Sequence, residues 1–169
     1  MTEAWLNGPV PDVEPLLQPV AHALIQVGED VPRAVAGLTP EQLWARPGGA
    51  ASLGFHLMHL AGSLDRLLTY ARGATLDEGQ RQAAAAERAA AGPEPGMDAL
   101  LAGLTRALEV SLEQVRQTSA ATLLEPRPVG RAGAPSTVLG LLFHAAEHAT
   151  RHAGQVITTA KIVRHEHPA

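Results

Sequence analysis

The stretch Leu139–Lys161, LGLLFHAAEHATRHAGQVITTAK, carries three of the chain's eight histidines at intervals of four residues. They are His144, His148 and His152. A step of four residues advances about 40° around an α-helix, so the three imidazoles share one face over two turns. Apolar residues lie beside this face, and the charged residues lie opposite. The pattern predicts a long helix with its histidines at the border of the buried side.

Histidines at the edge of a core need an explanation, because each ring nitrogen must find a partner there. Two imidazoles four residues apart on one helix can hold a single metal ion. A row of structural or solvated histidines is the alternative. Gln155 falls within the same arc and joins the candidate pocket, and Arg151 lies nearer the rim, where it could contact an anionic substrate.

Composition favours an all-helical protein. The chain has 169 residues, which indicates a single domain, 1–169, with its core between about residues 12 and 164. Apolar residues make up 46% and aromatic residues only 3%, and this Ala- and Leu-rich mixture suits close-packed helices. The formal net charge is −4, and there is no basic patch. Nucleic acid is therefore not an expected partner.

The absence of cysteine excludes a disulfide, a catalytic thiol and a thiolate metal ligand. A bound metal would have to be held by His, Asp or Glu. The first residues have neither the basic nor the apolar region of a signal peptide, and no apolar run reaches the length of a membrane span. We expect a soluble, cytoplasmic protein without a membrane partner.

Helical spacing of apolar residues predicts four long helices. They are expected to cover about 12–31, 52–72, 97–118 and 137–164, with Ser52 and either Ser136 or Thr137 as N-caps. A short helix follows the cap Thr39, an Ala-rich one lies within 74–96, and 119–135 is expected to form an extended loop. No strand is predicted. The fold class is thus an all-α four-helix bundle with a short extra helix and long loops.

The second long helix repeats the pattern of the last one. His56 and His59 flank its apolar stripe, near the middle of the helix. Metal sites in helix bundles are built from side chains on facing helices, so two helices with inward-edge histidines strengthen the case for a site. The charges of residues 74–96 are expected to be solvated.

Three short sequence motifs resemble those of a known family. The last helix reads E-H-x-x-x-H-x-G-Q at Glu147–Gln155, and the second reads S-L-G-x-x-L-x-H at Ser52–His59, after W-x-R-P at Trp44–Pro47. These motifs resemble the DinB-like (damage-inducible, YfiT-type) superfamily of metal-binding four-helix bundles. The resemblance extends from about Val13 to Val163. The family often has Arg-Gly-Gln after the last ligand, where this chain has Ala153-Gly154-Gln155.

The resemblance implies a divalent metal ion, zinc or nickel, held by His59, His148 and His152. His56 and His144 are additional, and either could line the pocket or replace a ligand. Related proteins commonly form homodimers. Characterised members include thiol S-transferases that use bacillithiol or mycothiol, and a mycothiol-dependent isomerase.

The resemblance therefore implies a metal-dependent S-transferase that joins a low-molecular-weight thiol to a small electrophile. Three protein ligands leave a coordination position open, as in catalytic zinc sites, and a metal-bound thiol becomes a reactive thiolate. The lack of cysteine fits this chemistry, because the sulfur would come from solution. A metal-dependent hydrolase and a non-catalytic, stress-responsive metal-binding protein are the alternatives.

Overall fold

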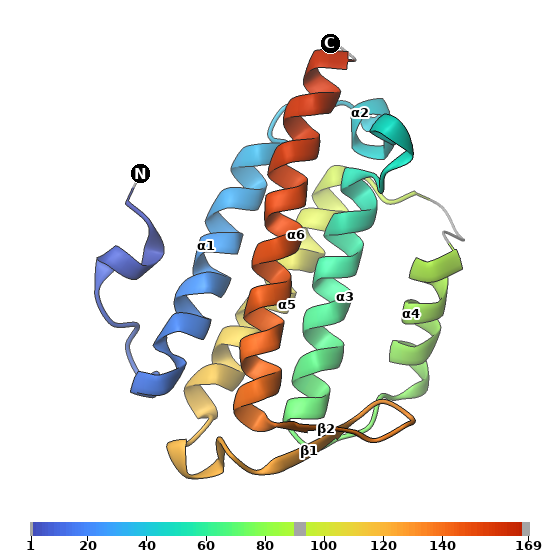
Figure 1. The fold of residues 1–169 in the computed structure, drawn as a ribbon. Coiled ribbons are helices and arrows are strands. Elements are labelled where there is room, and N and C mark those ends of the chain that lie inside the picture. The colour runs from blue at the N-terminus through green and yellow to red at the C-terminus, as the bar shows by residue number, and fades with distance from the viewer. Residues whose placement is uncertain (1, 90–93, 167–169) are drawn as a thin grey trace.

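Four long helices form the bundle that the sequence predicts (Figure 1). We describe residues 2–89 and 94–166 of a computed structural model. The long helices are α1 (Gln18–Val35), α3 (Leu53–Ala71), α5 (Met97–Gln117) and α6 (Val138–Glu166). Shorter elements are α2 (Pro40–Trp44), α4 (Glu78–Ala89) and the 3-10 turns Ala4–Asn7, Pro15–Leu17, Pro47–Gly49 and Ala120–Thr122.

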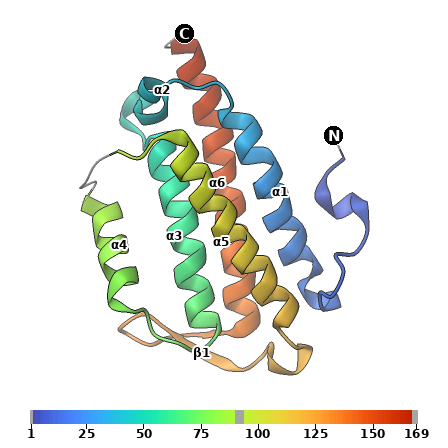
Figure 2. The same cartoon turned by 180° about the vertical axis from the view of Figure 1, so that it is seen from behind.

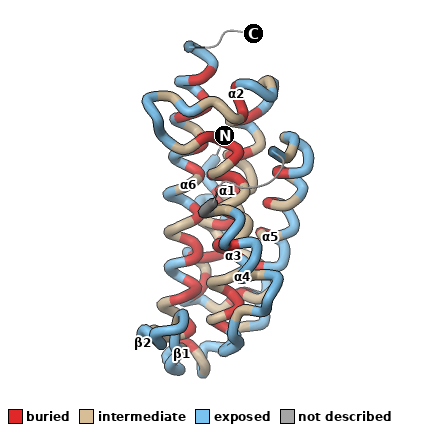
Figure 3. The backbone as a smooth tube through the Cα atoms, turned by 90° about the vertical axis from the view of Figure 1, so that its right-hand side faces the viewer, coloured by how far each residue is buried: buried red, intermediate tan, exposed pale blue. Residues whose placement is uncertain are grey.

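Helix α6 packs between α1 and α3, and α5 packs against the same two helices from behind (Figures 1 and 2). One cluster of buried apolar side chains from all four helices fills the space between them. In Figure 3 the buried residues recur along the inner sides of the helices. Within the described residues, no helix has the length and apolar character needed to cross a membrane.

The predicted N-caps are present. Ser52 Oγ accepts a hydrogen bond from the Phe55 backbone at 3.2 Å, and Thr137 Oγ1 accepts one from the Gly140 backbone at 3.0 Å. Thr39 forms a reciprocal capping box with Gln42. Each such cap is worth about 1 kcal/mol of stability, and those on α3 and α6 fix where the two histidine-bearing helices begin.

Trp44 explains why two of the sequence motifs occur together. Its indole lies on the backbone of Gly54, where an added Cβ would come within 2.5 Å of the ring. Only glycine permits this approach. The contact packs the end of α2 against the first turn of α3, the helix that carries His56 and His59.

The expectation that 119–135 is an extended loop without strands was wrong. Strands β1 (Pro126–Val129) and β2 (Ala134–Thr137) form an antiparallel hairpin, with Pro126 opposite Thr137. Three prolines in these strands argued against a sheet. However, both strands of a two-stranded hairpin are edge strands, and there a proline can lie where no ladder hydrogen bond is required. The hairpin covers one end of the bundle below α3 and α6 (Figure 1).

The Ala-rich helix within 74–96 is confirmed as α4, which lies outside α3 (Figures 1 and 2). Among the side chains of this segment that the structure describes, the expectation that the charges are solvated was wrong for Glu87. The Glu87 side chain is only 11% exposed, because it turns toward α3 and pairs with Arg66 there. This residue belongs to the candidate site.

Candidate metal centre

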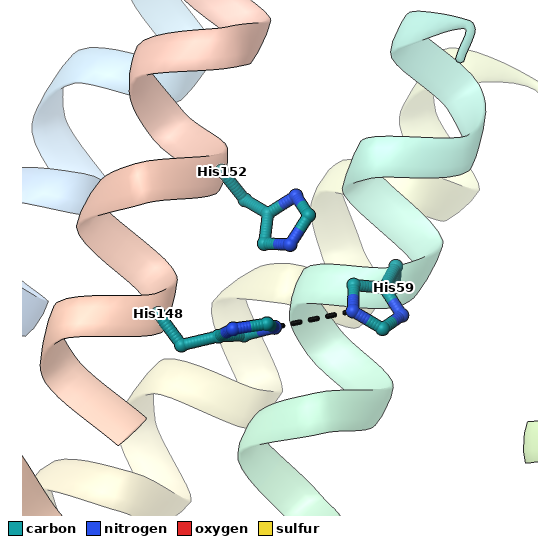
Figure 4. Close-up of side chains that lie close together, drawn as sticks. All are labelled: His59, His148 and His152. Carbon is teal, nitrogen blue, oxygen red and sulfur yellow. Dashed lines mark hydrogen bonds between the residues drawn. The ribbon is translucent and has the colours of Figure 1, made fainter. Parts of the chain in front are cut away.

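The structure brings together three of the histidines that the sequence singled out. His59 extends from α3, and His148 and His152 extend from successive turns of α6 (Figure 4). One ring nitrogen from each lies within 4.8 Å of the others. His59 Nε2 is 3.1 Å from His148 Nε2. Among the described residues, these three form a group that could hold a metal ion.

Helical geometry places these rings at the rim of the core. Leu60 and Ala149, which follow His59 and His148 in the chain, are fully buried. A neighbour is turned by about 100° around the helix, so burying Leu60 and Ala149 leaves the histidines at the edge. Since α3 and α6 pack against each other, their two edges meet.

Glu87 contacts the side of His59 that faces away from the cluster. Its Oε2 lies 3.0 Å from His59 Nδ1, and the carboxylate also accepts hydrogen bonds of 2.8 and 3.1 Å from the Arg66 guanidinium. A carboxylate held by arginine is an acceptor, so His59 Nδ1 carries the proton. The lone pair of His59 is then on Nε2, which faces His148.

His56 has a similar relation to His152. It is buried, and its Nδ1 lies 3.0 Å from His152 Nδ1. This contact uses one ring nitrogen of His152 and leaves Nε2 for the cluster. The pocket candidate His56 therefore lies directly behind the three-histidine group, where it holds the His152 ring in place.

The other pocket candidates lie at the surface. His144 is 51% exposed and pairs with Glu147 at 3.3 Å. Arg151 is 53% exposed and pairs with the same carboxylate. Gln155 is exposed as well. The His144 ring is still near the cluster, with its centroid 5.5 Å from that of His148.

The donor set fits a divalent transition metal. Zinc–nitrogen bonds of about 2.0–2.1 Å in a tetrahedron place two ligand nitrogens about 3.3 Å apart. The His59–His148 separation of 3.1 Å is close to this value, and small rotations bring in the third nitrogen. Imidazole suits zinc and nickel alike. Three nitrogens leave at least one coordination position for another molecule. That the three histidines act as ligands stays a prediction.

Burial keeps the imidazoles neutral. Desolvation, with smaller effects from neighbouring histidines, lowers the pKa of His56 and His148. The same causes lower the pKa of His152 from its ordinary 6.5 to about 4. Only a neutral imidazole has a lone pair to give to a metal. The lowered pKa values of His148 and His152 therefore leave these two rings with lone pairs for a cation at neutral pH.

These pKa shifts predict how the stability of the metal-free protein depends on pH. A histidine with a lowered folded pKa takes up its proton more readily when unfolded. The contribution of His152 to the free energy of unfolding is therefore fully present above about pH 6.5. It is lost as the pH decreases toward 4. Denaturant unfolding in the presence of a chelator measures this effect. His152→Gln should reduce the slope of the free energy of unfolding against pH between 6.5 and 4. An unchanged slope would contradict the lowered pKa of His152.

A cleft of about 770 Å³ lies beside the cluster, lined mainly by residues of α3, α4 and α5 and closed by the end of α2 and the turn that follows it. Its walls include Trp44, Phe55, Met58, Ala86, Glu87 and Gly103. None of the three clustered histidines lines it. The cleft meets the centre through Glu87 and through Phe55, whose ring is stacked on His59 with centroids 5.5 Å apart.

Comparison with known proteins agrees with this architecture. No curated protein matches the chain at a significant level. A sequence model of the DinB superfamily matches residues 23–156, which include most of the bundle and all three clustered histidines. The match covers more than half of the chain, and the chain belongs to the DinB superfamily.

Proposed function

We propose that the protein is a metal-dependent S-transferase that activates a low-molecular-weight thiol for transfer to a small electrophile. The observation that supports this most strongly is the three-histidine group itself. Three imidazole ligands with an open coordination position are typical of catalytic metal sites, whereas structural sites are closed by a fourth protein ligand.

The arrangement of the histidines and their neighbours supports this proposal. His59, His148 and His152 would hold the ion, while Glu87 and His56 orient two of the three rings. A zinc or nickel ion at this position would bind the thiol sulfur as thiolate and lower the pKa of the thiol. Burial lowers the pKa of His148 and His152, so these two rings compete less for the proton that the thiol releases.

The sulfur would come from a diffusible thiol, because the chain contains no cysteine. The thiolate attacks the electrophilic carbon, a carbon–sulfur bond forms, and the leaving group departs with the electrons of its bond. The thiol proton passes to solvent. We propose bacillithiol or mycothiol as the thiol, in line with the characterised relatives that the resemblance suggested.

Conjugation of a chlorodinitrobenzene to bacillithiol, mycothiol or glutathione tests the proposal. The rate with the metal-loaded protein should exceed that with chelated protein or with His152→Ala. It should also flatten at a lower pH than the uncatalysed reaction, which follows a free thiol pKa near 8.5. His144→Ala is the matched control and should retain its activity. If none of the three thiols gives a metal-dependent rate, a hydrolase or a non-catalytic metal-binding protein becomes the better account.

A further inference from the structure

Glu87 is the acidic side chain of α4 that is turned against the bundle. It is 11% exposed and lies between Arg66, which is 15% exposed, and His59. Both carboxylate oxygens are used: Oε1 accepts from Arg66 Nη1, and Oε2 accepts from Arg66 Nη2 and from His59 Nδ1. The carboxylate therefore bridges two residues of α3 that lie two turns apart.

We propose that Glu87 is a positioning residue of the metal centre and that, through it, metal binding tightens α4 against α3. This inference rests on the proposed metal site. Its physical basis is the His59 imidazole. A neutral imidazole can carry its proton on either nitrogen, and the Glu87 carboxylate selects the form with the proton on Nδ1 and the lone pair on Nε2.

The effect works in both directions. An imidazole that donates its Nε2 lone pair to a cation becomes a stronger hydrogen-bond donor at Nδ1, because the ring loses electron density. The His59–Glu87 bond then strengthens and holds α4 more firmly. By linkage, the factor by which metal binding strengthens the docking of α4 equals the factor by which docking of α4 strengthens metal binding.

Gly62 shows that α3 is shaped to receive this carboxylate. An added Cβ at this position would lie 2.2 Å from Glu87 Oε1 and 2.8 Å from Arg66 Nη1. The ion pair therefore lies directly on the α3 backbone, one turn from His59. A larger residue would displace the carboxylate from His59.

The position of α4 also shapes the cleft. Helix α4 packs chiefly against α3, and Ala83, Ala86 and Glu87 form its side of the cleft wall. A change in how firmly α4 is docked therefore changes the cleft beside the metal centre. If the Arg66–Glu87 pair only held α4 in place, substitution of Glu87 would change neither the affinity for the metal nor the position of the proton on His59. The two roles can therefore be told apart by measurement.

Glu87→Gln and its control Glu78→Gln test the inference in the full-length, untagged chain. Glu78 lies on the same helix, but it is exposed and pairs with Arg81 instead. Competition of Zn²⁺ against a chromophoric chelator should give about 10–100-fold weaker binding for Glu87→Gln, the usual effect of losing an outer-shell partner. Glu78→Gln should bind zinc as the wild type does.

Two further measurements need no activity. The ¹⁵N shifts of His59 in the chelated protein should show the Nδ1–H form in the wild type and a mixture of forms in Glu87→Gln. Hydrogen exchange of α4 should slow on adding Zn²⁺ to the wild type but not to Glu87→Gln. These two measurements distinguish a Glu87 that positions the His59 ring from a Glu87 that only holds α4 in place.

A second variant approaches the same contact from the α3 backbone. Gly62→Ala should weaken zinc binding, although alanine favours the helix. Gly103→Ala on α5, where an added Cβ meets nothing within 4 Å, should leave it unchanged. If the wild type binds zinc and Glu87→Gln binds equally well with an unchanged His59 proton, the inference is overturned while the proposed function stands. If the wild type binds no zinc, both fail.

Discussion

His148→Ala is expected to abolish stoichiometric metal binding. The variant removes one of the three imidazole nitrogens that lie within 4.8 Å of one another among the described residues, and the remaining two come from different helices. Loss of an outer-shell partner already costs about 10–100-fold in metal affinity, so loss of a ligand should cost more than about 100-fold. Element analysis of the purified, untagged protein measures the effect.

The matched control is His144→Ala. It lies one turn earlier on the same helix, but it is half exposed and pairs with Glu147 instead of joining the group. It should retain about one metal ion per chain. Full metal occupancy in His148→Ala would show that His148 is not a required ligand.

Removal of the metal is expected to lower the thermal stability of the protein. An ion that binds only the folded state stabilises it by about 2.7 kcal/mol at a hundredfold excess over Kd. For a chain of this size, that corresponds to roughly 5–10 °C in Tm. The bound ion would stabilise the fold because it would join α3 to α6 through His59 and the two histidines of α6.

Thermal unfolding of loaded and chelated protein checks this prediction, with His148→Ala as the reference that should show no shift. Chelation that leaves Tm unchanged, with metal loss confirmed by element analysis, would mean that the ion does not link the two helices.

Much of the bundle could be predicted because it depends on local rules. The helical spacing of apolar residues places the buried faces, and Ser52, Thr39 and Thr137 cap helices where their sequence positions predict. Helical spacing also placed five histidines beside the buried faces of two helices, and the family resemblance singled out His59, His148 and His152 among them. Leu60 and Ala149, which follow His59 and His148, are buried, so these two histidines lie at the edges of faces that pack together.

Contacts between distant parts of the chain could not be predicted in this way. Glu87 lies 28 residues after His59, in an Ala-rich helix with no clear apolar stripe, so no local pattern indicated which of its charges faces inward. The hairpin was missed because proline usually argues against a strand. A helical wheel placed Gln155 and His144 beside the ligands. However, it gives only the direction of each side chain around the helix axis, and it does not show which turns of the helix a neighbouring helix covers.

A crystal structure of the zinc-loaded, untagged protein, with anomalous scattering at the zinc edge, tests the central claim most directly. We expect one strong peak per chain, bonded to ring nitrogens of His59, His148 and His152 at about 2.0–2.1 Å, with a further position filled by solvent or thiol. A peak held by other residues, a shell closed by a fourth protein ligand, or no peak between α3 and α6 would contradict it.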